Sequence, residues 1–189
     1  MKKVCVIGGS GFLGSHVADQ LSECGYKVRI YDRSVSPWVR EDQEMIVGDI
    51  LDQDLLSQSI EGCEAVYNFA AIADLDEALN RPLDTAKINI LGNVMILETC
   101  RRYGIMRFVY ASTVYVHSRE GGFYRCSKQA AEQYVEEYSR TFGLNYTILR
   151  YGSLYGPRSD HHNGLWRIVK RAVENGRISY EGSSEAMRQ

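Results

Sequence analysis

Short apolar runs alternate along the chain with longer segments in which apolar residues recur every three or four positions. The short runs predict strands at residues 4–7, 28–31, 45–47, 65–69, 108–111 and 146–149. The longer segments predict helices over residues 12–24, 52–60, 84–103 and 124–142. Strands that are apolar at nearly every position are typical of a parallel sheet covered by helices on both faces. The pattern therefore predicts an α/β fold built on a doubly wound parallel sheet.

The regular alternation ends near residue 150. Beyond it, Gly156 and Pro157 mark a turn, residues 165–173 have helical spacing, and residues 178–180 fit one short strand. We therefore expect a main domain over residues 1–150 and a small, incomplete lobe over residues 151–189.

Composition and charge exclude several classes of protein. Apolar residues make up 44% and charged residues 24% of the 189 residues, which is ordinary for a folded domain and argues against disorder. Lysine plus arginine number 22 and aspartate plus glutamate 24, and this near balance argues against nucleic acid or a membrane surface as a partner held by bulk charge. No apolar run approaches the ~20 residues of a membrane span, and the glycine-interrupted start of the chain does not fit a signal peptide.

Cysteines and histidines give no prediction of a metal site. The five cysteines are odd in number and widely spaced, which favours the reduced thiols of a cytoplasmic protein over disulfides or zinc ligands. His161 and His162 are adjacent, but no third ligand has suitable spacing, so a polar loop is the preferred interpretation.

A glycine-rich turn, Gly8-Gly9-Ser10-Gly11-Phe12-Leu13-Gly14, joins the first predicted strand to the first predicted helix. Glycines at Gly8, Gly11 and Gly14 permit a tight turn, a close approach to a pyrophosphate and close packing of the helix on the sheet. The N–H groups at the start of the helix suit phosphates. A turn without a ligand is the simpler alternative, but the position between strand and helix is the one that the mechanism requires. The motif predicts a dinucleotide site on a sheet of the Rossmann type.

Asp32 closes the second predicted strand, where an acid can accept hydrogen bonds from the adenosine ribose. A carboxylate there repels a 2′-phosphate and favours NAD over NADP, although Arg33 beside it weakens that preference. The predicted cofactor contacts in this part of the chain are Gly8, Ser10, Gly11, Phe12, Leu13, Gly14, Asp32 and Arg33.

Tyr124 and Lys128 stand four residues apart, on one face of the predicted helix. A nearby lysine favours the phenolate, so we expect Lys128 to lower the pKa of Tyr124 toward a value useful for a general base. Such a pair is common by chance in a chain with 13 tyrosines, and a solvated helix face is the plain alternative. The preceding strand, however, ends in Ser112 and Thr113, and a hydroxyl there can share the hydrogen bonds of a substrate alcohol with the tyrosine.

With these motifs the chain resembles the extended short-chain dehydrogenase/reductases, the NAD-dependent epimerase/dehydratase family that acts on nucleotide sugars. The resemblance covers nearly the whole chain and is carried by residues 8–14, 32, 48–50, 68–71, 89, 92, 110–113, 124, 128 and 149–158. It implies that Tyr124 is the base, that Lys128 binds the nicotinamide ribose, and that Thr113 is the third catalytic residue. It implies that Asn89 is structural.

The resemblance also implies further binding residues. Asp49 and Ile50 are similar to the family's adenine contact. The remaining cofactor contacts that it implies are Phe69, Ala70, Ala71, Ala73, Ser112, Tyr124, Lys128 and Tyr151. The substrate contacts that it implies are Ser153, Arg158 and Arg188.

Three departures from the family pattern bear on the function. Residues 114–123 alone separate Thr113 from Tyr124, where the family has a longer loop with substrate contacts. Val114 and Tyr115 follow Thr113, where members that dehydrate at C4 and C6 resemble Thr-Asp-Glu, so 4,6-dehydration is not expected. The sequence also stops shortly after residues that resemble the start of a further family segment, so we expect a C-terminally truncated substrate-binding lobe after the NAD-binding domain.

On this resemblance we expect an NAD-dependent nucleotide-sugar epimerase. Tyr124 would take the proton from the 4-hydroxyl as a hydride leaves C4 for the nicotinamide, and Thr113 would hold the same oxygen. The 4-keto sugar would then turn and receive the hydride on its other face. Two alternatives stay open: an NAD(P)H-dependent ketoreductase that acts on a 4-keto sugar nucleotide, and a truncated NAD-binding protein without turnover. The family's dimer contact predicts a homodimer through helices 84–103 and 123–142.

Overall fold

A computed structural model describes residues 2–177 of the chain. The chain divides into two compact units, Met1–Arg150 and a second unit that begins at Tyr151. The strand predicted at residues 178–180 and the substrate contact predicted at Arg188 lie outside the described residues.

The first unit is built on a six-stranded sheet with the strand order β3-β2-β1-β4-β5-β6. The strands are β1 (Lys3–Ile7), β2 (Lys27–Asp32), β3 (Glu44–Val47), β4 (Ala65–Asn68), β5 (Arg107–Thr113) and β6 (Tyr146–Tyr151). The pairs β1–β2, β1–β4, β2–β3 and β4–β5 are parallel. The predicted Rossmann-type sheet is therefore confirmed, with β6 running two residues further than expected.

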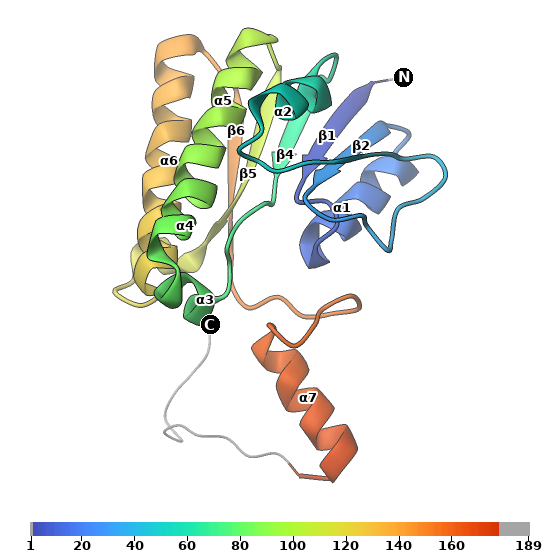
Figure 1. The fold of residues 1–189 in the computed structure, drawn as a ribbon, viewed down its shortest axis with the longest axis vertical. Helices are drawn as coiled ribbons and strands as arrows, with labels where there is room; N and C mark the ends of the chain where they lie inside the picture. Colours follow the sequence, from blue (N-terminus) through green and yellow to red (C-terminus); the bar gives the residue numbers. More distant parts are fainter. Residues whose placement is uncertain (1, 178–189) are drawn as a thin grey trace. The chain divides into compact units, whose positions relative to one another are not determined.

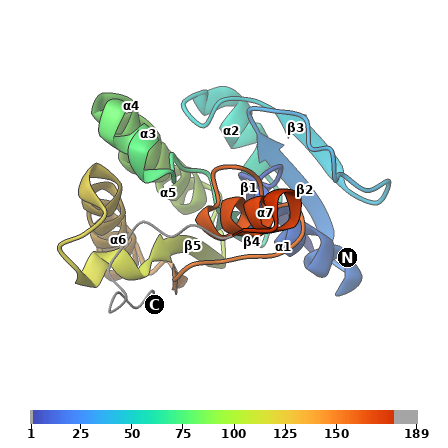
Figure 2. The same cartoon turned by 90° about the horizontal axis from the view of Figure 1, so that it is seen from below.

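Alternate residues of the central strands point to opposite faces of the sheet. Cys5 and Ile7 of β1 belong to a large apolar cluster that also takes in α2 (Gln53–Ile60), α5 (Asn93–Arg102) and α6 (Gly122–Phe142). Val4 and Val6 belong to a smaller cluster with α1 (Phe12–Glu23) on the other face. The sheet is thus covered on both sides, as a doubly wound fold requires (Figures 1 and 2).

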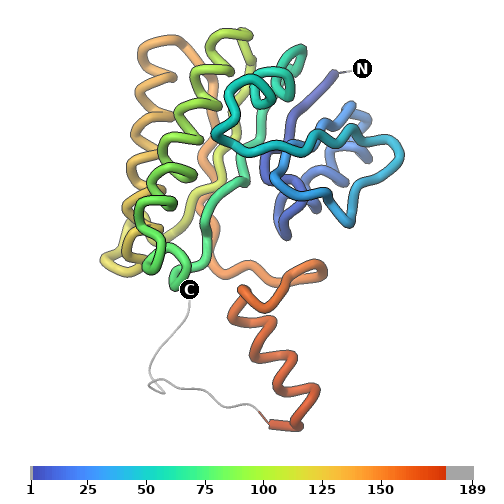
Figure 3. The backbone as a smooth tube through the Cα atoms, viewed as in Figure 1, coloured from blue at the N-terminus to red at the C-terminus, as the bar shows by residue number. Residues whose placement is uncertain are grey.

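The helix predicted over residues 84–103 is wrong as a single α-helix. After α3 (Leu75–Asn80), the chain forms α4 (Pro82–Ala86), a π-helical segment (Lys87–Gly92) and then α5, and Figure 3 shows the backbone coiling through these last three without a break. Asn89 lies in the wider π turn. Its amide bonds both backbone groups of Ile72, at 2.8 and 3.0 Å, and the hydroxyl of Ser127 on α6, at 2.9 Å. The π segment therefore holds the loop after β4 and the start of α6 together, which supports a structural role for Asn89.

A short connection leads from β5 into α6. A 3-10 turn (Val114–His117) follows β5, and two glycines with positive φ, Gly121 at +89° and Gly122 at +49°, start α6. A Cβ on Gly121 would also lie 3.1 Å from the Tyr115 ring. The paired glycines thus let residues 114–123 turn back within a few residues, so that Tyr124 lies in the first turn of α6.

In the second unit, α7 (Gly164–Asn175) is the helix among the described residues. Asn163 caps it by accepting the N–H of Trp166 at 3.0 Å, and its amide donates to the carbonyl of Leu154 at 2.7 Å. Of the helices described here, none is both long enough and apolar enough to cross a membrane.

Candidate functional site

The glycine turn follows β1, the strand at which the order of strand addition in the sheet reverses. From β1 the chain proceeds through β2 to β3 on one side, whereas β4, β5 and β6 extend the sheet on the other. In doubly wound sheets, ligands bind at this switch point, beyond the carboxyl ends of the strands. The loop after β4 meets the glycine turn there, because a Cβ on Gly8 would lie only 2.5 Å from the backbone nitrogen of Ala70.

The geometry of the turn fits a dinucleotide phosphate. Gly14 packs against the turn so closely that a Cβ would lie 2.2 Å from the carbonyl oxygen of Gly8. Gly11 caps α1 without a side-chain hydrogen bond, and the first turn of α1 contains no acidic residue. The N–H groups and the positive end of the helix dipole are therefore available to an anion.

Asp32 lies beside this turn at the end of β2. Its Oδ2 accepts the N–H of Ser10 at 3.0 Å, and its Oδ1 accepts the N–H of Ser34 at 3.1 Å. The carboxylate is only partly buried and Arg33 is exposed. Both side chains thus lie at the edge where the ribose of a dinucleotide on the turn would be placed.

The other predicted cofactor residues are spread over the same edge of the sheet. Asp49 is exposed and its Oδ1 accepts the N–H of Leu51 at 2.8 Å, whereas Ile50 is buried and packs against Gly92. Phe69 packs against the smaller apolar cluster. Ala70 and Ala71 are partly buried in the loop after β4 and Ala73 is exposed.

The three predicted catalytic residues come together at the end of β5 and the start of α6. The hydroxyl of Thr113 lies near the phenol of Tyr124, where hydrogen bonding lowers the pKa of the phenol, and it accepts the N–H of Tyr115 at 3.2 Å. Lys128 is buried one turn after Tyr124, with its Nζ 5.8 Å from the centre of the Tyr124 ring. The tyrosine and a strand-end hydroxyl are therefore neighbours, as a shared hydrogen bond to a substrate alcohol requires.

The predicted effect of Lys128 on Tyr124 is wrong for the chain by itself. Burial raises the pKa of Tyr124 to about 12, because the phenolate is poorly solvated there, and the bond from Thr113 offsets this only in part. Burial lowers the pKa of Lys128 to about 7. The ammonium, moreover, donates to the carbonyl of Ala111 at 2.7 Å and lies over the ring of Tyr110 at 4.7 Å, not against the phenol oxygen.

Sequence reasoning missed a partly buried ionic network beside the predicted catalytic residues. Glu132 of α6 binds Arg150 of β6, and the hydroxyl of Ser112 donates to the same carboxylate. The sequence predicts that Ser112 contacts the cofactor, but its hydroxyl donates a hydrogen bond to Glu132 instead. The spacing of four residues between Lys128 and Glu132 could have indicated a contact on one helix face. The pairing with Arg150, 18 residues further on, depends on how β6 lies beside β5.

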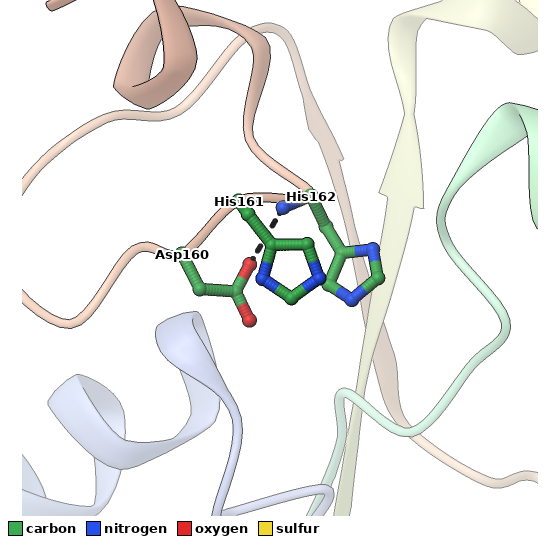
Figure 4. A group of neighbouring side chains, drawn as sticks. All are labelled: Asp160, His161 and His162. Carbon is green, nitrogen blue, oxygen red and sulfur yellow. Dashed lines mark hydrogen bonds between the residues drawn. The ribbon is translucent and has the colours of Figure 1, made fainter. Parts of the chain in front are cut away.

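In the second unit, the residues predicted to contact cofactor or substrate are surface or turn residues. Tyr151 closes β6 and is partly buried, Ser153 is exposed, and Arg158 is partly buried with a left-handed backbone at φ +68°. His161 and His162 do have a third potential ligand, because a ligand atom of Asp160 lies within 4.8 Å of both histidines (Figure 4). The spacing argument against such a group was wrong, since three consecutive residues of one loop can converge. All three are exposed, and one Asp160 oxygen accepts the N–H of His162 at 3.0 Å.

Comparison with known proteins finds relatives that are named as UDP-glucose 4-epimerases. The chain is 33% identical over 175 residues to a putative UDP-glucose 4-epimerase of Methanocaldococcus jannaschii, covering 83% of this chain and 57% of that protein. It is 32% identical over 204 residues to the UDP-glucose 4-epimerase of Yersinia pestis, covering 94% of this chain and 60% of that protein. The chain thus spans less than two thirds of the length of these relatives.

Solved structures of UDP-glucose 4-epimerases are also similar to this chain. The UDP-glucose 4-epimerase of Thermotoga maritima with UDP-glucose superposes with a TM-score of 0.83 at 30% identity, over 90% of this chain and 62% of that one. The enzyme of Thermus thermophilus in complex with NAD gives a TM-score of 0.80 at 29% identity, over 90% and 61%. The model of the NAD-dependent epimerase/dehydratase family matches residues 4–189. The chain is therefore a member of the NAD-dependent epimerase/dehydratase family, and its cofactor is NAD.

Proposed function

We propose that this chain belongs to a nucleotide-sugar 4-epimerase, with the first unit holding NAD and the second forming part of the substrate lobe. The observation that carries the proposal is the contact between Thr113 and Tyr124 beside the buried Lys128. This group lies at the carboxyl end of β5, one strand away from the loop that touches the glycine turn. Relatives and structural neighbours named as UDP-glucose 4-epimerases support the same substrate class.

The cofactor would be held by groups already described. The first turn of α1 would take the pyrophosphate, Asp32 the adenosine ribose, and Lys128 the nicotinamide ribose. When bound, NAD supplies a hydride acceptor that can also return the hydride. We further propose Asp49, Ile50 and the loop 69–73 as the adenine side and the wall of the cleft.

The chain's own residues would handle the substrate oxygen and its proton. Thr113 and Tyr124 would hold the 4-oxygen between them, and Tyr124 would remove its proton during oxidation and return it during reduction. Because the pKa of Tyr124 is about 12 in the chain by itself, the phenolate needs a positive charge nearby before it can act as a base. A protonated Lys128, whose Nζ lies 5.8 Å from the centre of the Tyr124 ring, would supply that charge.

Epimerisation fits better than 4,6-dehydration. Dehydration requires acid and base groups that expel a second hydroxyl, and Val114 and Tyr115 occupy the two positions after Thr113. Neither residue carries a carboxylate. Tyr115 instead packs on Gly121 and closes the short loop.

The test is to incubate the protein with NAD and UDP-glucose and to identify the sugar product by NMR. The 4-epimer, formed without net change in NADH absorbance, is the expected result. In a second incubation, with NADH and a 4-keto sugar nucleotide, stoichiometric consumption of NADH would identify a ketoreductase instead. NAD binding without any product would refute catalysis by this chain.

We also propose a homodimer. An open, largely apolar groove runs along the helical segment 82–102 and α6, and its lining residues are Ala86, Lys87, Ile90, Leu91, Val94 and Tyr134. Leu91 and Tyr134 are 50% and 45% exposed, which is high for large apolar side chains on one continuous face. A second copy that presents the same two helices would cover this groove.

A further inference from the structure

Glu132 connects the three elements that carry the candidate active site. It lies on α6, one turn after Lys128 and two turns after Tyr124. From β6, Arg150 donates its Nε–H to Glu132 Oε1 at 3.0 Å and an Nη2–H to Oε2 at 2.7 Å. From β5, Ser112 donates its hydroxyl to Oε1. Ser112 immediately precedes Thr113, so the carboxylate is tied to the backbone that positions the catalytic hydroxyl.

The carboxylate is buried and stays ionised. The Glu132 side chain is 8% exposed, while that of Arg150 is 39% exposed and reaches an open polar hollow that His117 and Glu136 also line. A buried carboxylate is costly unless it is fully hydrogen-bonded, and here three donors meet it. The bonds from Arg150 and Ser112 hold the pKa of Glu132 below its usual value.

Glu132 lies one helical turn from Lys128 on α6, so its negative charge acts on the Lys128 ammonium. The groups around the Lys128 ammonium are the carbonyl of Ala111 and the rings of Tyr110 and Tyr124, all of which are uncharged near neutral pH. Glu132 acts to raise the pKa of Lys128, against the larger effect of burial. The titratable groups that act on Glu132 are Arg150 on β6 and His117 in the turn after β5.

We propose that Glu132 is a positioning residue for the catalytic pair: it fixes the strand end that carries Thr113 against α6 and supplies the negative charge that faces Lys128. The effect of Glu132 on catalysis rests on the proposed function, whereas its effect on the titration of Lys128 does not. An anchor that only held β6 to α6 would leave the protonation of Lys128 unchanged. The titration of Lys128 therefore separates a positioning role from a purely structural one.

The experiment follows Lys128 by NMR in protein labelled with ¹³C at the lysine side chains, without cofactor or substrate. The chain has six lysines, and the Lys128→Met variant identifies the signal of Lys128 by its loss. In Glu132→Gln, which keeps the shape of the side chain, the midpoint of Lys128 should fall on the order of 1 pH unit below wild type. In Glu132→Asp, which keeps the charge, most of that fall should be recovered. Glu136→Gln, one turn further along α6, is the matched control and should leave the midpoint in place.

An unchanged midpoint in folded Glu132→Gln would overturn the proposal. Should that variant fail to fold, Arg150→Gln removes the partner of the carboxylate at a half-exposed position, and the midpoint of Lys128 should then rise. An unmoved midpoint in Arg150→Gln would equally overturn the proposal. If wild type epimerises UDP-glucose, the pH profile of kcat in Glu132→Gln should shift in the same direction as the Lys128 midpoint. Absence of turnover in wild type would count against the proposed function alone, because the titration needs no turnover.

Discussion

Lys128 directs its ammonium to the carbonyl oxygen of Ala111, at 2.7 Å, while the ring of Tyr124, one turn earlier on α6, has its centre 5.8 Å from the same nitrogen. The neighbouring polar group that lowers the pKa of Tyr124 is the hydroxyl of Thr113 instead. Lys128 is buried and Tyr124 is partly buried, and removal from water raises the pKa of the phenol to about 12 and lowers that of the ammonium to about 7. Between these two values neither residue carries a charge, so in the chain by itself Tyr124 is a neutral phenol and not a phenolate.

The low pKa of Lys128 makes stability depend on pH. In the unfolded chain Lys128 titrates near 10.5 and in the folded chain near 7, so below about pH 7 its charge is buried at full cost. Between pH 7 and 10.5 the folded chain has lost this proton, whereas the unfolded chain still holds it. The free-energy cost of losing the proton on folding falls as the pH approaches 10.5. Replacing Lys128 by Met should therefore stabilise the protein more at about pH 6 than at about pH 9, by ~3 kcal/mol. Urea unfolding of both proteins at the two pH values measures this difference. The lost bond to Ala111 cancels in the comparison, and an equal effect at both pH values would contradict the low pKa.

Tyr124→Phe should abolish turnover and spare cofactor binding. The variant removes the oxygen that exchanges the proton but keeps the ring that packs beside Lys128. We expect kcat for UDP-glucose epimerisation to fall by ~10²-fold or more. NAD affinity, measured by calorimetry, should stay within about twofold of wild type, since no phosphate or adenosine contact is changed. Tyr103→Phe, at the exposed end of α5, is the control that should leave both unchanged. Substantial activity in Tyr124→Phe would exclude the proposed base.

Asp32→Ala should alter the preference between the two dinucleotides. The carboxylate can accept ribose hydroxyls and repels a 2′-phosphate, so its removal should weaken NAD more than NADP. Asp32 also accepts backbone N–H groups of Ser10 and Ser34, so some loosening of the turn will weaken both. The ratio of the two dissociation constants removes this shared effect. A ratio equal to that of wild type would refute the ribose assignment.

Gly14→Ala should destabilise the first unit, whereas Gly11→Ala should not. A Cβ on Gly14 would lie 2.2 Å from the carbonyl oxygen of Gly8 and 2.9 Å from Gly9 Cα, and backbone atoms cannot move aside easily. At Gly11 the nearest atom is 3.5 Å away and φ is −76°, which any residue adopts. We expect Gly14→Ala to lower the free energy of unfolding by ~1–3 kcal/mol. Urea denaturation of the two variants tests this, and equal stabilities would show that the turn can relax.

Leu91→Glu should separate the proposed dimer into monomers. Leu91 lies in the groove between the helical segment 82–102 and α6, and a charge there would be buried against the second copy. Sedimentation equilibrium should show a dimer for wild type and a monomer for Leu91→Glu. Met106→Glu places the same charge on another exposed apolar side chain and should stay dimeric. A monomeric wild type would refute the interface.

Local features of the sequence were sufficient to predict most of the fold. Strands buried on both faces must be apolar at nearly every position, so their runs are visible without knowledge of their neighbours. The glycine turn is local in part, because Gly8 has a φ of +78° and a Cβ on Gly14 would meet the backbone of Gly8 and Gly9, whereas the close approach of Ala70 to Gly8 comes from the tertiary fold. The Tyr124–Lys128 pair follows from helical spacing alone.

The sequence by itself thus determined which elements form, where the glycine turn falls, and which residues carry reactive groups. Only the tertiary structure decided where Lys128 points, that Glu132 joins Ser112 to Arg150, and that residues 87–92 widen into a π turn around Asn89. These features depend on contacts between residues far apart in the chain, and a local sequence pattern does not identify such partners. The protonation of Tyr124 and Lys128 belongs to the same class, because it depends on how fully the packed fold removes each group from water.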